Sequence, residues 1–259
     1  MPRNLKYSIV TPSFNQAATL PKTMDSVLSQ EYPNLEYFIY DARSTDGSGQ
    51  IIKKFANNYP KTIKFQIRKD RGQADALNQA FSKSTGDILA FINSDDYYLP
   101  DTFSKVSKYF LDHPECQWLV GDCQVVGQPL TWTFWLKEII PYDRFPSLLY
   151  LFNFVNQPSV FIRRGIFQKA GIFDINLHYC FDYDFWLRLL KVSSPHRLKV
   201  SLASFRISAT SKGSTGFQKQ FTEDYLVVQK YTNNSIILAI HWLLDQFVIK
   251  SYAFLKKNS

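Results

Sequence analysis

Residues 86–101 read GDILAFINSDDYYLPD, a stretch in which a fully apolar segment is followed directly by a polar turn. The apolar segment, Ile88–Ile92, is typical of a strand that is buried on both faces of a sheet. Asp95 and Asp96 follow it, and a helical pattern begins near Asp101. We therefore expect a buried strand that ends in two neighbouring carboxylates.

Three further runs that favour a strand precede it, at Tyr7–Thr11, Leu35–Tyr40 and Ile63–Ile67. A segment with helical periodicity follows each of the four runs. Strands and helices that alternate in this way predict an α/β fold, with a mostly parallel central sheet and helices on both of its faces. Ligands of such sheets bind beyond the carboxyl ends of the strands. The residues just after each run are therefore the candidate site.

Carboxylates follow three of the four predicted strands. Oxygen ligands of this kind hold Mg²⁺ or Mn²⁺ and often bridge the ion to substrate phosphates, which favours a metal or sugar site over a hydrophobic one. Each group also has a structural interpretation, as a solvated turn, an Asx turn or a helix cap. Taken by themselves, the residues leave both interpretations open for Asp41, Asp46, Asp70, Asp95 and Asp96.

The second half of the chain has a less regular pattern. Asp182 and Asp184 stand at the start of a predicted helix, where acidic side chains complement the helix dipole. A carboxylate can also act there as a general base, although the residues alone favour the capping role. Residues 129–150 show no clear periodicity. We expect strands near Trp118–Val126 and Lys199–Phe205, and helices near residues 163–170, 182–190, 217–231 and 235–257.

The composition excludes several classes of protein. The chain has 259 residues, 45% of them hydrophobic, so it can bury a full core and is neither disordered nor collagen-like. Its net charge of +8 favours anionic partners, but the basic residues are dispersed, so no nucleic-acid partner is expected. Three scattered cysteines predict no disulfide framework, and the four histidines are expected at the surface or in caps. The absence of an apolar leader predicts a cytoplasmic protein.

Taken together, these segments resemble the family 2 glycosyltransferases of the GT-A fold over about residues 5–230. The resemblance rests on several motifs in the same order and at the same distances as in that family. They are SIVTPSFNQAATLPKTMDSVLSQEYPNLEYFIYDARSTDGS (8–48), GQADALNQA (72–80), the stretch 86–101 quoted above, NQPSVFIRRGIFQKAGIFD (156–174) and DYDFWLRLLK (182–191).

The resemblance implies an inverting transfer of a sugar from a nucleotide-diphosphate sugar, most simply a UDP-sugar. It also implies a divalent cation, Mn²⁺ or Mg²⁺, because charge develops on the departing diphosphate. A carboxylate is needed to take the proton of the attacking acceptor hydroxyl. The resemblance places nucleotide-sugar contacts at Pro12, Ser13, Phe14, Asp41, Asp70, Arg71 and Asp95, metal contacts at Asp96 and Asp95, and the catalytic base at Asp182.

Two positions depart from the family pattern. Many relatives read Asp-Gly-Gly-Ser or Asp-Asp-Gly-Ser after the second strand, whereas this chain has Ala42 and Arg43 between Asp41 and Ser44. The preference for the donor base is therefore open, and Arg43 is a candidate phosphate contact. Many relatives also place Glu before the catalytic Asp, and this chain has Phe181 there. Asp184 therefore remains a second candidate for the base, although on a helix it points about 200° away from Asp182.

We expect a glycosyltransferase domain over residues 1–232, with a nucleotide-sugar-binding half at 1–115 and an acceptor half at 116–232. An amphipathic helix is expected at 233–259. Its apolar face and its lysines are typical of a helix that lies on an anionic membrane surface. Packing of the helix on the domain or on a dimer partner would explain the same pattern equally well. The resemblance implies a glycan or a polyprenyl-diphosphate-linked acceptor in cell-surface polysaccharide synthesis, and with it a location at the inner face of the membrane.

Two alternatives remain at this point. A non-catalytic sugar-nucleotide-binding or scaffold protein on the same fold would be expected to lack Asp96 or Asp182, and both are present. A nucleotidyltransferase would be expected to have a Gly-rich, basic loop after its first strand. The residues Pro12–Gln16 contain neither a glycine nor a cation.

Overall fold

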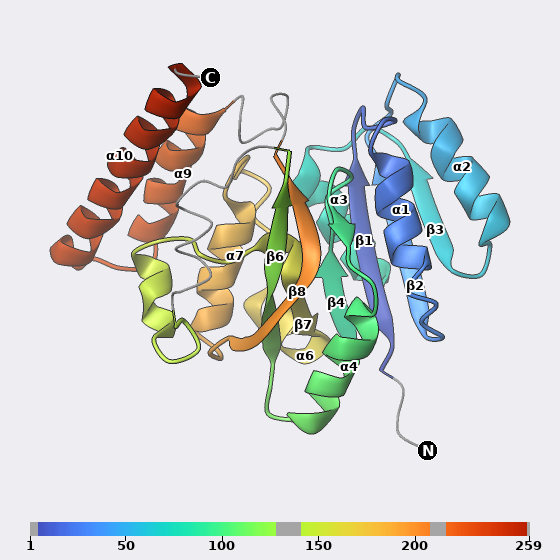
Figure 1. Cartoon of the computed structure of the whole chain (residues 1–259), viewed down its shortest axis with the longest axis horizontal. Helices are drawn as coiled ribbons and strands as arrows, with labels where there is room; N and C mark the ends of the chain where they lie inside the picture. The colour runs from blue at the N-terminus through green and yellow to red at the C-terminus, as the bar shows by residue number, and fades with distance from the viewer. Residues whose placement is uncertain (1–4, 128–140, 208–215, 258–259) are drawn as a thin grey trace.

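One eight-stranded sheet runs through the computed structural model of the chain, with helices packed against both faces (Figure 1). The structure describes residues 5–127, 141–207 and 216–257, so most of the aperiodic stretch 129–150 lies outside the described residues. The strand order is β3-β2-β1-β4-β7-β6-β8-β5. The strands are β1 (Tyr7–Ser13), β2 (Leu35–Asp41), β3 (Ile63–Ile67), β4 (Ile88–Phe91), β5 (Tyr97–Tyr98), β6 (Trp118–Val126), β7 (Val160–Arg163) and β8 (His196–Arg206).

The first half of the chain forms the parallel part of this sheet. β1 pairs in parallel with β2 on one side and with β4 on the other, and β3 pairs in parallel with β2. This arrangement confirms the α/β fold expected from the alternating pattern. The helices of this half are α1 (Leu20–Leu28), α2 (Ser48–Asn58), α3 (Gln73–Lys83) and α4 (Thr102–Asp112).

The second half extends the same sheet with mixed directions. β7 pairs antiparallel with β4, where Leu89 lies opposite Ile162. β6 is antiparallel to β7 and parallel to β8, and the short β5 is antiparallel to β8. The sequence does not predict β5 or β7. The helical elements of this half are η1 (Pro146–Tyr150), η2 (Gln157–Ser159), α6 (Arg164–Ala170), α7 (Phe181–Leu190), α9 (Phe217–Gln229) and α10 (Ser235–Lys257).

Two hydrophobic cores lie on opposite faces of the sheet, because successive strand residues point in opposite directions. Ile9 belongs to the core under α1, α2 and α4, whereas its neighbour Val10 belongs to the core under α3, α6 and α7. Both side chains are completely buried. Stacked indole rings of Trp118 and Trp186, with centroids 6.1 Å apart, join β6 to α7 in the second core. Burial on both faces explains why β4 contains only apolar residues.

The C-terminal helix α10 lies beside α9 at one end of the molecule (Figure 1). Its inner face is buried and includes His241, Asp245 and Val248. The surface position expected for His241 is therefore wrong, since this side chain is fully buried. None of the helices among the described residues is long and apolar enough to cross a membrane. The outer face of α10 leaves large apolar side chains exposed, among them Ile236, Ile240, Trp242, Leu243 and Phe247.

Candidate active site

The ends of β1, β2 and β3 meet at one edge of the sheet, because the three strands are parallel and in register. Ser13 and Asp41 are the last residues of β1 and β2 and lie opposite each other. The Ser13 hydroxyl donates to Oδ2 of Asp41 at 3.1 Å, and the amide of Arg68, just after β3, donates to the Asp41 carbonyl at 3.0 Å. The three polar turns after these strands are therefore neighbours in space.

The carboxylate of Asp41 is buried within its own turn. Ser44 donates to it twice, through its amide at 2.8 Å and through its hydroxyl at 2.5 Å, and Asp41 is only 1% exposed. Arg43 within the same turn has a φ of 62°, the left-handed conformation that favours glycine. Arg43 thus has the backbone conformation of the glycine found at this position in the pattern that the sequence resembles. For a residue with a side chain, this conformation costs about 1 kcal/mol. The effect of Arg43 on the donor stays a prediction.

A pocket of about 600 Å³ opens beside this edge, a volume in the range of small-molecule sites. Burial raises the pKa of Asp70 in this pocket, and the nearby Asp75 and Asp41 raise it further. Arg71 forms an ion pair with Asp75 at 3.2 Å and leaves most of its side chain exposed. The pocket combines three cations with two carboxylates and so suits a phosphorylated ligand. It is lined by Arg68, Lys69, Asp70, Arg71, Asp75 and Gln79.

The turn after β4 carries the predicted pair of aspartates. Asp96 is 1% exposed, and its Oδ1 accepts the backbone N–H of Arg206 at 2.8 Å. The guanidinium of Arg206 donates to the Asp95 carbonyl at 3.2 Å. Arg206 was not predicted, because the sequence does not reveal that the end of β8 lies beside the turn after β4. Asp95 and Asp96, by contrast, were predictable because they follow an apolar strand in the sequence.

The two aspartates have the character of a cation site. Burial raises the pKa of Asp96 well above its usual range, and the charge of Asp95 adds to this effect. Burial also raises the pKa of Asp95, despite the nearby positive charge of Arg206. Paired carboxylates that resist ionisation are stabilised by a divalent cation, and their oxygens are the ligands that Mg²⁺ and Mn²⁺ prefer. The residues present therefore fit the expected metal.

The start of α7 packs against the end of β4. The ring of Phe181, the first residue of α7, lies 6.2 Å from the ring of Phe91, the last residue of β4. Asp182 directly follows Phe181 and is half-buried. Its Oδ1 accepts a hydrogen bond from the backbone N–H of Tyr183 at 2.7 Å. The start of α7 therefore packs against β4, the strand that is followed by Asp95 and Asp96. The role of Asp182 as the base stays a prediction.

The second candidate for the base, Asp184, is engaged in a buried ion pair. Its Oδ2 lies 3.0 Å from the guanidinium of Arg188, and its Oδ1 accepts the hydroxyl of Tyr231 at 2.7 Å. Asp184 is 4% exposed and faces the packing between α7 and α9. These contacts give Asp184 a structural role between the two helices.

The loop before α7 is held by a residue that was not predicted. Glu223 of α9 accepts three successive backbone N–H groups, those of His178 at 3.0 Å, Tyr179 at 2.6 Å and Cys180 at 2.7 Å. Cys180 is the residue before α7. No sequence signal links Glu223 to this loop, because the two are about forty residues apart and meet only through the tertiary fold.

The remaining predicted positions lie on the first strand and turn. Pro12 and Ser13 are buried at the end of β1, whereas the ring of Phe14 is 60% exposed next to them. Asp46 accepts the amides of Ala17 and Ser48, and the bond to Ser48 is the expected Asx turn before α2. The nucleotide-contact roles of Pro12, Ser13 and Phe14 stay predictions.

Comparison with known proteins identifies related sequences. The model of the family described as glycosyl transferase family 2 matches residues 8–171. A PGL/p-HBAD biosynthesis glycosyltransferase of Mycobacterium tuberculosis is 30% identical over 183 residues, which are 70% of this chain and 68% of that protein. A glycosyltransferase of Rickettsia prowazekii, described as uncharacterized, is 27% identical over 260 residues, or 97% of this chain and 80% of that protein.

Solved structures share the fold. Residues 1–349 of Staphylococcus aureus TarS, in complex with UDP-GlcNAc, match with a TM-score of 0.71 and 18% identity, over 94% of this chain and 73% of that one. The chain covers 44% of a longer TarS structure. The mannosyltransferase PcManGT of Pyrobaculum calidifontis, with GDP-Man and Mn²⁺, matches with a TM-score of 0.71 and 17% identity, over 94% and 70%. These neighbours have the GT-A fold.

Proposed function

Because the chain belongs to glycosyl transferase family 2, we propose that it is an inverting transferase that uses a nucleotide-diphosphate sugar. The acceptor would be a saccharide or a lipid-linked saccharide in cell-surface polysaccharide synthesis. The observation that carries the proposal is the pair Asp95 and Asp96 in the turn after β4, where burial raises the pKa of both carboxylates. The contact between Phe181 and Phe91 supports it, because it packs the start of α7, on which Asp182 stands, against β4. A base and a cation site on either side of a sugar are what inversion requires.

The donor would bind at the edge formed by the ends of β1, β2 and β3. The pocket beside Asp70 supports this placement through its three cations, of which Arg71 is the most suitable phosphate contact. The exposed ring of Phe14 is suited to pack on a nucleoside. We propose a UDP-sugar, and the UDP-GlcNAc complex of TarS supports this choice. PcManGT binds GDP-Man, so the alternative base for the test is guanine.

Each catalytic group would have one task. The Asp182 carboxylate would take the proton of the acceptor hydroxyl as that oxygen attacks the anomeric carbon from the face opposite the diphosphate. Asp96 would hold the divalent cation together with Asp95. When bound, the cation supplies the positive charge that stabilises the departing nucleoside diphosphate. Arg206 would keep the turn of Asp95 and Asp96 in place through its backbone and side-chain hydrogen bonds.

The outer face of α10 would contact the membrane that carries a lipid-linked acceptor. Trp242, Leu243 and Phe247 are about half exposed or more on this face, and Lys250 is also exposed. Apolar side chains combined with nearby cations favour binding to an anionic lipid surface. Co-sedimentation with vesicles tests this part of the proposal. Binding to anionic but not to neutral vesicles is expected, and the double variant Leu243→Ser with Phe247→Ser should abolish it.

A screen of nucleotide sugars by thermal shift tests the donor, because a ligand that binds only the folded state raises the melting temperature. We expect UDP-sugars to stabilise the protein with Mn²⁺ and much less without it, and GDP-sugars to have little effect. Stabilisation by GDP-sugars alone would contradict the choice of donor. Metal-dependent binding without any turnover of a range of acceptors would instead favour the non-catalytic, sugar-nucleotide-binding alternative.

A further inference from the structure

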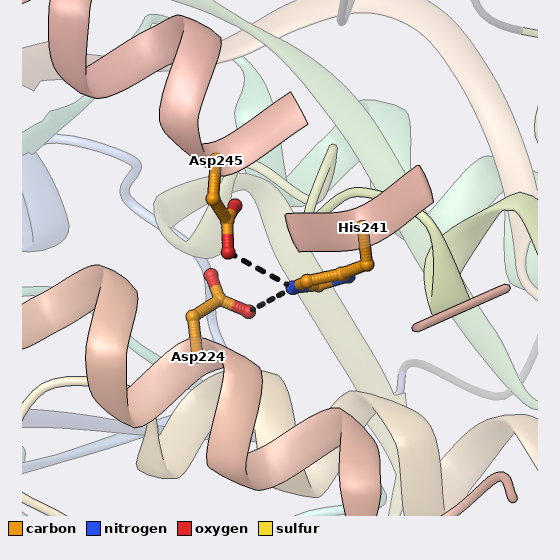
Figure 2. A group of neighbouring side chains, drawn as sticks. All are labelled: Asp224, His241 and Asp245. Carbon is orange, nitrogen blue, oxygen red and sulfur yellow. Dashed lines mark ion pairs between the residues drawn. The ribbon is translucent and has the colours of Figure 1, made fainter. Parts of the chain in front are cut away.

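Three buried side chains converge between α9 and α10 (Figure 2). Asp224 comes from α9, and His241 and Asp245 lie one turn apart on α10 (Figure 2). His241 is fully buried, and the two aspartates are 6% and 4% exposed. One ligand atom from each residue can be chosen so that all three atoms lie within 4.8 Å of one another.

The environment of His241 fixes which ring nitrogen faces the carboxylates. Nδ1 lies 3.0 Å from the carbonyl oxygen of Tyr150 in η1. A carbonyl only accepts hydrogen bonds, so Nδ1 must carry the hydrogen. In the neutral ring, Nε2 then has a free lone pair, and Nε2 is the atom that points at Asp224 and Asp245 (Figure 2). A histidine that ligates a metal typically donates its other N–H to a carbonyl in this way.

The two distances from Nε2 of His241 are longer than a charge-assisted hydrogen bond and close to the spacing of ligands around a metal ion. Nε2 of His241 lies 3.4 Å from Oδ1 of Asp224 and 3.3 Å from Oδ2 of Asp245. A charge-assisted hydrogen bond would shorten these distances to about 2.8 Å. Two atoms, Nε2 of His241 and Oδ2 of Asp245, are buried and make no hydrogen bond within the described part of the chain. Ligands on a tetrahedral zinc ion, with bonds of about 2.0–2.1 Å, are about 3.4 Å apart.

We propose that Asp224, His241 and Asp245 form a structural site for a divalent first-row metal ion, with zinc as the best match. Two carboxylates and a neutral imidazole balance the charge of such an ion, and imidazole and carboxylate are both common zinc ligands. Three protein ligands leave a fourth position for a water molecule. This site is separate from the cation site of Asp95 and Asp96 and does not depend on the proposed function.

The ion would fasten α10 to the rest of the fold. Two of its ligands come from α10 and one from α9, and the Tyr150 carbonyl connects the imidazole to η1. The ring of Tyr183 stacks beside His241 with centroids 6.2 Å apart, and Tyr183 is the residue after Asp182. The proposed metal site therefore packs against the first turn of α7.

Elemental analysis of the purified chain, produced without a polyhistidine tag and dialysed after exposure to Zn²⁺, tests the proposal. We expect about one zinc ion per chain in the wild type and in Asp96→Asn, which alters only the other cation site. His241→Gln and Asp245→Asn should each lose the zinc. Wild-type protein that retains no divalent metal would overturn the proposal, and so would a His241→Gln variant that retains as much zinc as the wild type.

X-ray absorption at the zinc edge keeps the test decisive if the variants fail to fold. The wild-type spectrum should show a shell of nitrogen and oxygen at about 2.0–2.1 Å that includes one imidazole. A sulfur shell at about 2.3 Å would place the ion on cysteine and contradict the site. Removal of the ion by a chelator should lower the melting temperature of the wild type and leave that of His241→Gln unchanged.

Discussion

The carboxylate of Glu223 lies 2.7 Å from the backbone nitrogen of Cys180, so α9 holds the residue immediately before α7. The same carboxylate accepts the amides of His178 and Tyr179. Three charge-assisted bonds to one short segment restrict its position strongly. Since Asp182 lies two residues further on, Glu223 is a positioning residue for the proposed base.

Loss of this carboxylate should slow turnover without weakening the binding of the donor. We expect Glu223→Ala to lower kcat about tenfold, which corresponds to about 1.4 kcal/mol, with an unchanged KM for the nucleotide sugar. Glu223→Gln should recover part of the activity, because its amide oxygen still accepts backbone N–H groups. Steady-state kinetics measure both effects. A raised donor KM with normal kcat would place Glu223 outside the positioning of the base.

Asp182 and Asp184 provide a matched pair of substitutions on one helix. Asp182→Asn should lower kcat by at least about a hundredfold, because it removes the proton acceptor, while nucleotide binding and the melting temperature stay close to normal. Asp184→Asn should lower the free energy of unfolding by about 3 kcal/mol, because it leaves the buried part of Arg188 without its carboxylate. Kinetics and chemical denaturation distinguish the two. Normal turnover by Asp182→Asn would refute its role as base.

Asp96 should reduce stability in the metal-free protein. Its pKa is raised in the folded state, so the charged form is disfavoured there and its ionisation opposes folding at neutral pH. We expect Asp96→Asn to melt at or above the temperature of the wild type in EDTA, and to lose all stabilisation by nucleotide sugars with Mn²⁺. Thermal shift with and without Mn²⁺ measures both. Nucleotide stabilisation equal to that of the wild type would exclude Asp96 as the metal ligand.

Glu36 on β2 should give the protein a measurable acid dependence. Burial alone would raise its pKa, but bonds from Ser8, Lys64 and Thr85 lower it to about 2. A lowered carboxyl pKa adds stability that is fully present above the unfolded value of 4.5 and is lost as the pH falls through about 2. Glu36→Gln should therefore cost about 2 kcal/mol at pH 7.

The cost of Glu36→Gln should shrink as the pH falls. Urea denaturation at pH 7, 5 and 3 measures the difference in unfolding free energy between the two proteins. A difference that stays constant over this range would show that Glu36 contributes packing rather than charge. Asp112→Asn is a suitable control, because this carboxylate forms an exposed ion pair with Lys108.

The parallel half of the fold was predictable because its signals are local. β4 is a continuous apolar run, and the predicted Ile63–Ile67 coincides with β3. The strands that were missed have weaker signals. β5 is two residues long, and β7 is a four-residue strand between a 3-10 helix and α6, so neither is long enough to show a period.

The candidate site was predictable where it follows the strands and unpredictable where it depends on distant contacts. Asp95 and Asp96 follow an apolar run, whereas Arg206 and Glu223 reach their partners only through the packing of β8 and α9. His241 was misjudged, although it stands four residues before Asp245 on a predicted helix and thus on the same face. The third member of that cluster, Asp224, comes from another helix and could not be found from spacing.

The antiparallel pairing of Leu89 with Ile162 has a consequence for protein engineering. Residue 115 is the sequence-predicted boundary between the two halves of the chain, and so an obvious point at which to exchange the second half between relatives. A chimaera made there would have to rebuild the backbone ladder between β4 and β7, so the incoming strand must match both the length and the register of the resident one. Specificity is therefore better transplanted by exchanging the loops beyond the strand ends, where the sheet imposes no register.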